Sequence, residues 1–315
     1  MRELLFISQK IDAFNALIGR WLSWLVVAVV LLNIPMALLF PMRAHFVLRR
    51  LGARVHPRVL VPTVILGNVA GALTPASSGE LLRTTMLRSH ADLPVEDGLA
   101  LVLYERALSV WILAMGTAIV ASFIALELTQ ALAVAAVALL LAMLPVAGPW
   151  LLDRLPAVGE EERHGVLRSA LRRLQRVAGR LQLLLGDRML LAGWSLLTAA
   201  IFAITTLQLW LLARSVSHAI SPAEAWTAFG ASQLAGIASL LPLGLGAADG
   251  SLAALLRRMG TTFEQGTVVA ILVRATMTLP LGIMAVTSYA YLVRISGNAP
   301  REEMPRRVDA PLGGG

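Results

Sequence analysis

Six charged residues lie inside or against long apolar stretches of this chain, where a bilayer core would surround them. A charge at the centre of a membrane costs about 3 kcal/mol on insertion scales, so such residues persist where they are paired or functional. They comprise three carboxylates and three guanidinium groups: Glu80, Arg83, Glu105, Arg106, Asp249 and Arg274. A planar guanidinium can bind a phosphate through two hydrogen bonds, and a carboxylate at membrane depth can carry a proton or a cation. The six residues therefore predict a polar centre inside a membrane protein.

Three interpretations of these charges stay open at the level of the sequence. In the first, Glu80 and Asp249 each pair with an arginine and only hold broken helices in place, as buried ion pairs can do. In the second, the arginines receive the phosphate of a lipid headgroup. In the third, Glu80, Glu105 or Asp249 carries a proton or a cation that couples transport to a gradient.

Residues 74–106 are echoed by residues 241–274, and both copies contain the charged residues. Two pairs match at a spacing of 167 positions: Pro75 with Pro242, and Gly79 with Gly246. Three further pairs match at a spacing of 168: Glu96 with Glu264, Gly98 with Gly266, and Arg106 with Arg274. A one-residue insertion in the second copy explains the step. An internal repeat with ionisable residues at membrane depth is typical of a transporter.

The composition predicts an all-α, polytopic integral membrane protein. Hydrophobic residues make up 57% of the 315 residues, charged residues make up 15%, and the mean hydropathy is +0.73. Five apolar runs are long enough to cross a bilayer core of roughly 30 Å, where only helices satisfy the backbone. They are residues 21–41, 99–126, 131–152, 189–213 and 267–293.

Two further hydrophobic stretches, residues 59–76 and 226–243, are interrupted by glycine, proline and polar residues. Each leads directly into one copy of the repeat. Segments of this kind in corresponding places of two halves are typical of broken or re-entrant helices at a transporter binding site. The alternative is two ordinary helices with small packing residues. If 59–76 enters and returns, the arginine-rich segments 42–58 and 153–188 share the cytoplasmic side, and the two repeats are inverted.

The predicted organisation has five segments. They are an N-terminal membrane helix and basic loop (1–58), repeat 1 (59–152), a basic amphipathic linker (153–188), repeat 2 (189–293) and a disordered tail (294–315). In the linker, valine and leucine at helical spacing lie opposite arginine. This pattern predicts either an amphipathic helix on the inner leaflet or a positively charged loop with helical propensity.

The sequence predicts no enzyme, no metal site and no cofactor. The histidines show no ligand spacing and are predicted to lie in loops: His45, His56, His90, His164 and His218. The chain has no cysteine, no glycine-rich phosphate loop after a strand and no nucleophile elbow. The net charge of +8 comes from arginines beside apolar segments. This is typical of cytoplasmic loops and does not indicate a nucleic-acid partner.

Two signatures make the chain similar to a known family. A short hydrophobic segment, then Pro75, Gly79-Glu80 and Arg83, and then Glu105-Arg106 in the next long helix, resembles the flippase-like membrane family. That family includes the transmembrane region of lysylphosphatidylglycerol synthases. The second signature is present as Pro242, Gly244, Gly246, Asp249, Gly260 and Arg274, and the resemblance covers roughly residues 35–293. The family more often has Gly-Gly where this chain has Leu243-Gly244, and Glu where it has Asp249.

The resemblance implies a stand-alone member without the soluble transferase domain of the synthases. We expect a flippase in the bacterial inner membrane that moves an anionic or glycosylated lipid between leaflets. The expected substrate-binding or transport residues are Pro75, Gly79, Glu80, Arg83, Glu105, Arg106, Pro242, Gly246, Asp249 and Arg274. One alternative is a non-transporting scaffold for a lipid-modifying or glycosyl transferase, and another is an ion-coupled transporter of small solutes. The expected partners are lipids with anionic headgroups and, for the scaffold, a transferase.

Overall fold

The secondary structure of the described part of the chain is helical throughout. The computed structural model describes residues 24–125, 127–129, 132, 136, 166–216 and 220–297, and no strand occurs among them. This confirms the predicted all-α class. Four stretches are long and apolar enough to cross a membrane, namely Trp24–Arg50, Val95–Ala125, Arg188–Val216 and Phe263–Ile295. The protein is therefore a polytopic membrane protein, as its composition predicts.

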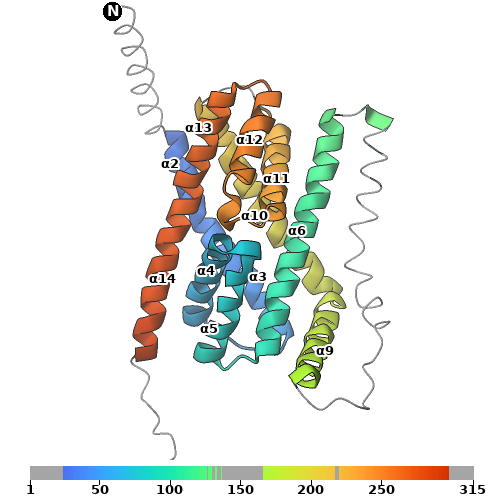
Figure 1. Cartoon of the computed structure of the whole chain (residues 1–315), viewed down its shortest axis with the longest axis vertical. Coiled ribbons are helices and arrows are strands. Elements are labelled where there is room, and N and C mark those ends of the chain that lie inside the picture. The colour runs from blue at the N-terminus through green and yellow to red at the C-terminus, as the bar shows by residue number, and fades with distance from the viewer. Residues whose placement is uncertain are drawn as a thin grey trace, which may run out of the picture.

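These stretches correspond to four of the five predicted spans (Figure 1). The first consists of α2 (Trp24–Leu31) and α3 (Asn33–Arg50), the second is α6 (Val95–Ala125) and the third is α10 (Arg188–Val216). The fourth consists of α13 (Phe263–Val273), the π-helical segment η3 (Arg274–Thr278) and α14 (Leu279–Gly297). The predicted span 131–152 lies almost entirely outside the described residues. The predicted tail also lies outside them, except that its first four residues form the end of α14.

The predicted basic loop at 42–58 is wrong over most of its length. Helix α3 continues to Arg50, so the connection to the next helix is only residues 51–56. The helix continues because Ala44, Val47 and Leu48 recur at helical spacing and are buried in the core. Two histidines were likewise predicted in loops but lie in helices, His45 in α3 and His90 in α5 (Leu81–Ala91).

Two helical hairpins occupy the places of the interrupted segments. Hairpin 1 consists of α4 (Pro57–Leu73), the 3₁₀ turn η1 (Pro75–Glu80) and α5 (Leu81–Ala91). Hairpin 2 consists of α11 (Pro222–Ala238), the turn η2 (Pro242–Gly244) and α12 (Ala247–Arg258). Figure 1 shows hairpin 1 in the lower half and hairpin 2 in the upper half, with their turns facing each other, and η1 contacts η2. The inverted symmetry of the repeats and a re-entrant course through the membrane stay predictions.

Proline starts both the entering helix and the turn of each hairpin. Pro57 and Pro222 occupy the first helical position, where the missing N–H group breaks no hydrogen bond. Pro75 and Pro242 begin the two turns. The residues before these two prolines, Thr74 and Leu241, are extended, as is usual before proline, so the chain leaves the helical path at both turns.

Each hairpin is packed into its own hydrophobic core. The first core joins hairpin 1 to α3, α6 and the beginning of α10, and includes Leu48, Val64, Leu101, Tyr104 and Trp194. The second core joins hairpin 2 to α13 and the end of α10, and includes Leu209, Ala228, Leu256 and Leu272. The two hairpin turns therefore meet between two cores of closely packed side chains.

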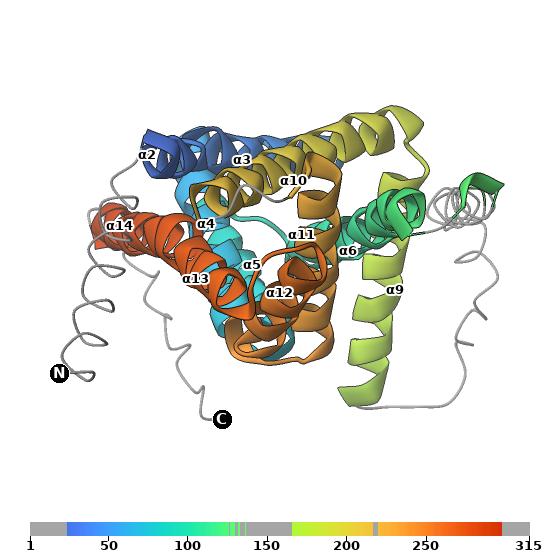
Figure 2. The ribbon, with the colours of Figure 1, turned by 90° about the horizontal axis from the view of Figure 1, so that it is seen from above.

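Helix α9 (Val166–Leu185) runs across the end of α6 (Figure 2). Val177 and Leu184 are buried in the first core. Arg176 pairs with Glu96 at 3.0 Å, and Arg180 pairs with Asp97 at 2.8 Å. These carboxylates lie in the first turn of α6, where the helix dipole favours negative charge. Residues 166–185 of the linker are therefore helical, and the buried edge of this helix packs against the first core. Its position on the inner leaflet stays a prediction.

Asp187 joins α3 to the start of α10. Its Oδ1 accepts hydrogen bonds from the backbone N–H groups of Met189 and Leu190, both at 3.0 Å, and its Oδ2 lies 2.6 Å from Arg50 Nε. The hydrogen bond from Leu190, the charge of Arg50 and the bond from Met189 lower the pKa of Asp187.

We expect Asp187→Ala to destabilise the protein by about 1 kcal/mol, because the helix loses its N-terminal cap. Asp187→Asn keeps an acceptor oxygen and should cost less. Since the lowered pKa belongs to the folded state, this contribution should be complete above the ordinary pKa of aspartate and disappear as the pH falls through the folded value. Thermal unfolding in detergent at neutral and acid pH measures both effects. An equal loss in the two variants would contradict the capping role.

Candidate functional site

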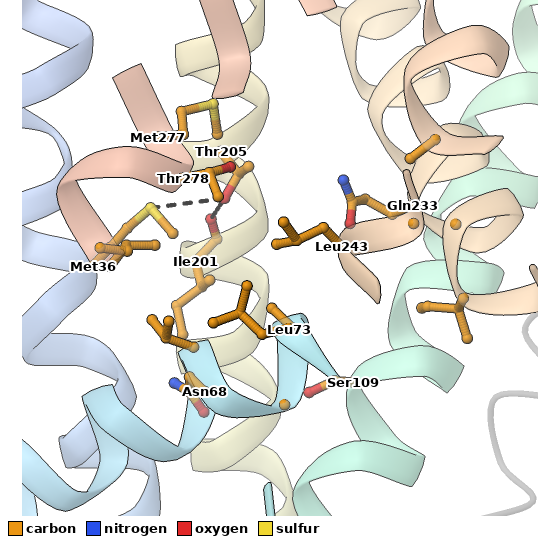
Figure 3. Close-up of a pocket in the computed structure, with 18 of the residues that line it drawn as sticks. Met36, Asn68, Leu73, Ser109, Ile201, Thr205, Gln233, Leu243, Met277 and Thr278 are labelled. Atoms are coloured by element: carbon orange, nitrogen blue, oxygen red, sulfur yellow. Dashed lines mark hydrogen bonds between the residues drawn. The ribbon is translucent and has the colours of Figure 1, made fainter. Parts of the chain in front are cut away.

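A cavity of about 610 Å³ lies where the two hairpin turns meet. Its walls come from both hairpins and from α3, α6, α10 and η3, so both halves of the protein contribute. Figure 3 shows Met36, Ile201 and Met277 on one side, and Asn68, Ser109 and Gln233 from α4, α6 and α11 on the others. A mostly apolar cavity of this size with a few converging polar groups is typical of a ligand site.

A buried triad of charges forms one wall of the cavity and the layer behind it. Glu105 of α6 binds Arg83 of α5 through its Oε2 atom. Its Oε1 atom lies 3.6 Å from Nε of Arg43 in α3. Neither of these last two atoms has a hydrogen-bond partner among the described residues. All three residues are buried, so a single carboxylate faces two guanidinium groups.

Arg43 is the site residue that the sequence analysis missed, because it was assigned to a cytoplasmic loop. Its guanidinium carbon lies 4.5 Å from the centre of the Trp194 ring. Its Nη1 atom donates to the hydroxyls of Ser109 and Thr198, both at 3.2 Å. Cation–π contact and hydroxyl acceptors thus hold the arginine against the cavity wall. The signal for its burial was the helical spacing of Ala44, Val47 and Leu48 after it.

The second ion pair faces the cavity more openly. Arg106 Nη1 lies 3.2 Å from Glu80 Oε1, and the side chains are 41% and 13% exposed, respectively. Glu80 is the last residue of η1 and lies against Gly71 of α4, where an added Cβ would overlap the Glu80 side chain. Within the turn, the backbone N–H of Gly79 donates to Thr74 Oγ1 at 2.6 Å. The hairpin turn therefore fixes the position of the Glu80 carboxylate.

The third ion pair is built into hairpin 2. Arg274 Nε and Nη2 donate to the two oxygens of Asp249 at 2.9 and 3.1 Å, and Nη2 also donates to the carbonyl of Leu243 at 2.7 Å. Asp249 in turn accepts the backbone N–H of Gly246 at 3.3 Å. Both residues of this pair are therefore hydrogen-bonded to the backbone at the turn of hairpin 2, which favours a structural role for Asp249.

The backbone is strained at the turn of hairpin 2. Leu243 has a φ of 56°, a left-handed conformation that is an outlier for a bulky residue. Its carbonyl is held by Arg274, which begins the π-helical segment η3. Within η3, the carbonyl of Thr276 accepts a hydrogen bond from Asn33 Nδ2 at 2.8 Å. Strained turns and π-helical insertions concentrate at functional sites in proteins.

The structure brings half of the predicted site residues to the cavity wall. Glu80, Glu105, Arg106, Asp249 and Arg274 line it. Arg83 lies behind Glu105. The remaining predicted residues, Pro75, Gly79, Pro242 and Gly246, shape the two turns and their ends.

The charges around the cavity do not balance. Within the part of the chain that the structure describes, the wall and the layer behind it hold four arginines and three carboxylates, which leaves one positive charge. The arginines are Arg43, Arg83, Arg106 and Arg274, and the carboxylates are Glu80, Glu105 and Asp249. From the sequence alone, three of each were expected, because Arg43 was assigned to a cytoplasmic segment. Each of these arginines contacts a carboxylate, but Arg43 and Arg83 share Glu105, so one positive charge beside the cavity is not neutralised.

The comparisons with known proteins are consistent with a membrane role. A family model described as the lysylphosphatidylglycerol synthase TM region matches residues 4–285. The comparison with curated proteins finds no match. The matched region contains the two hairpins and all four arginines of the cavity.

Proposed function

This chain belongs to the lysylphosphatidylglycerol synthase transmembrane-region family, and from that premise we propose that it moves a lipid with an anionic headgroup between the two leaflets of a membrane. The family links the protein to lipid metabolism or transport. We propose more specifically that the membrane is the bacterial inner membrane and that the lipid is anionic or glycosylated.

The observation that carries this proposal is the unbalanced positive charge at the cavity. Arg43 is buried and shares Glu105 with Arg83, so the site lacks one negative charge. A phosphate group supplies such a charge and accepts several hydrogen bonds from guanidinium groups. The apolar side chains of Met36, Ile201 and Met277 offer adjacent contact for the hydrocarbon part of a lipid.

The position of the cavity supports translocation in particular. It lies between two cores, where two hairpin turns meet that approach from opposite ends of the long helices. A movement of either hairpin against its core would change the access to the cavity from that side. Binding sites near the midplane, between two halves that move against each other, are typical of transporters. As a carrier, the protein would move the lipid without making or breaking a covalent bond.

Leaflet exchange tests the proposal directly. In liposomes that contain the purified protein, we expect labelled phosphatidylglycerol to exchange between leaflets, and Arg106→Gln to slow the exchange by about tenfold or more. The reason is that a hydrogen bond between charged groups contributes about 1.5 to 3 kcal/mol. The rate is measured with and without a proton gradient, because the carboxylates of the cavity could couple transport to one.

Arg258→Gln is the matched control, since Arg258 is exposed at the end of α12 and does not line the cavity. This variant should exchange lipid like the unaltered protein. Equal rates in the two variants would contradict headgroup binding at Arg106. If the unaltered protein exchanges none of several anionic lipids, the function is instead that of a scaffold for a transferase.

A further inference from the structure

Glu80 belongs to a charge cluster that is separate from the ion pair of hairpin 2. Near hairpin 1, Arg43, Arg83 and Arg106 face Glu80 and Glu105, which leaves one positive charge among these described residues. Across the cavity, Arg274 and Asp249 neutralise each other and are both bonded to the backbone of their turn. The net positive charge beside the cavity therefore comes from the residues near hairpin 1.

We propose that Glu80 sets the headgroup charge that this cavity accepts, favouring a lipid phosphodiester with one negative charge over a phosphomonoester with two. This inference rests on the proposed function, because it takes a lipid phosphate as the ligand. One negative charge brings the cluster to neutrality. A second one has no cationic partner there and is repelled by the carboxylate of Glu80.

The two headgroup classes differ in their charge at neutral pH. A phosphodiester carries a single negative charge at neutral pH. A phosphomonoester has a second pKa of about 6 and carries nearly two. In a partly buried site, a whole unit of charge at contact distance is worth far more than it is in water. A single carboxylate can therefore decide between the two classes.

The geometry keeps Glu80 where it can act in this way. Its carboxylate is 3.2 Å from Arg106 and lines the cavity, while its side chain is only 13% exposed. Gly71 leaves room for this side chain, and the 3₁₀ turn directly before α5 fixes its backbone. In the repeat, the position that corresponds to Glu80 is Ala247. Hairpin 2 has no carboxylate at that position, so the selectivity belongs to hairpin 1.

Competition binding tests the inference. Short-chain phosphatidylglycerol and phosphatidic acid with identical acyl chains compete against fluorescent phosphatidylglycerol for the purified protein in detergent, at neutral pH and low salt. We expect the unaltered protein to prefer phosphatidylglycerol. Glu80→Gln should shift the ratio of the two affinities by about tenfold toward phosphatidic acid, because the cluster then carries two positive charges.

Three further variants complete the test. Glu80→Asp keeps the charge and should keep the original preference. Glu264→Gln makes the same chemical change at an exposed residue outside the cavity and should also keep it. Arg106→Gln removes a positive charge and should weaken both lipids, phosphatidic acid the more. It keeps the inference testable if Glu80→Gln does not fold.

The outcomes separate the inference from the function on which it rests. If the unaltered protein binds phosphatidylglycerol but Glu80→Gln leaves the affinity ratio unchanged, the charge selection by Glu80 is overturned and the lipid site remains. The same shift in Glu264→Gln would also overturn it. If inorganic phosphate or glycerol phosphate competes as well as the lipids, the ligand is a free phosphate. If nothing anionic binds, the proposed function fails together with the inference.

Discussion

Glu105→Gln is expected to lower the stability of this protein by about 3 to 5 kcal/mol, the range observed when one partner of a buried ion pair is removed. Glu105 is the single carboxylate between Arg43 and Arg83, and all three side chains are buried. The amide of glutamine keeps a hydrogen-bond acceptor but carries no charge. Two guanidinium groups would then lie in a low-dielectric core without the carboxylate that contacts both of them.

The loss should be visible as a lower unfolding temperature in detergent and as reduced yield of folded protein. Glu127→Gln serves as the control, because Glu127 is exposed and the same chemical change there should have little effect. Membrane proteins often unfold irreversibly, so the two variants are compared at one heating rate. Similar unfolding temperatures in both would show that Arg43 and Arg83 reach water or another anion.

A double variant distinguishes the effect of charge on stability from the effect of packing in the triad. Glu105→Gln combined with Arg83→Met removes one negative and one positive charge, and should recover part of the lost stability. Arg43 would keep its contact with Trp194 and its hydrogen bonds to Ser109 and Thr198. No recovery would mean that Arg83 stabilises hairpin 1 through packing rather than through its charge.

Local sequence signals predicted the positions of the two turns and five charged residues that line the cavity. Pro75 and Pro242 each follow a short apolar segment, and the structure places a turn at both. Glu80 and Asp249 lie at or directly after those turns, and each pairs with the arginine that the repeat places in the following long helix. These relations depend on residues close together in the chain or on a regular repeat, which is why the sequence reveals them.

Arg43 could not be placed in the same way. An arginine directly after a long apolar run ordinarily marks the membrane surface. Here its nearest carboxylate is Glu105, which it shares with Arg83, and its ring contact is Trp194; both lie far along the chain on other helices. The π-helical segment that begins at Arg274 is similar, because the carbonyl of Thr276 within it accepts a hydrogen bond from Asn33, which lies far away in the sequence. Long-range contacts of this kind leave no local pattern.

The turn of hairpin 1 is expected to affect both the stability of the protein and its binding of lipid. We expect Gly79→Ala to destabilise the protein by about 2 to 3 kcal/mol, through overpacking. A Cβ at this position would overlap the carbonyl group of Ala70 and would lie 2.8 Å from Thr74 Oγ1. The obstacle is the backbone of α4, which cannot move aside as a flexible side chain could. The turn must therefore shift away from α4.

That shift would move the residue directly after Gly79, which is Glu80. Its carboxylate would leave its position against Gly71 and beside Arg106. We therefore expect lipid exchange by the folded fraction of Gly79→Ala to fall at least as far as in Arg106→Gln. Unfolding temperature and leaflet exchange, measured on the same preparation, report the two effects separately.

Gly250→Ala is the matched control, because Gly250 lies in α12 with nothing within 4 Å of an added Cβ. Alanine in a helix is favoured over glycine by up to about 1 kcal/mol, so this variant should be as stable as the unaltered protein or more so. It should also exchange lipid normally. If Gly79→Ala loses stability but keeps normal exchange, the position of Glu80 does not matter for transport, and the turn of hairpin 1 is only a structural clamp.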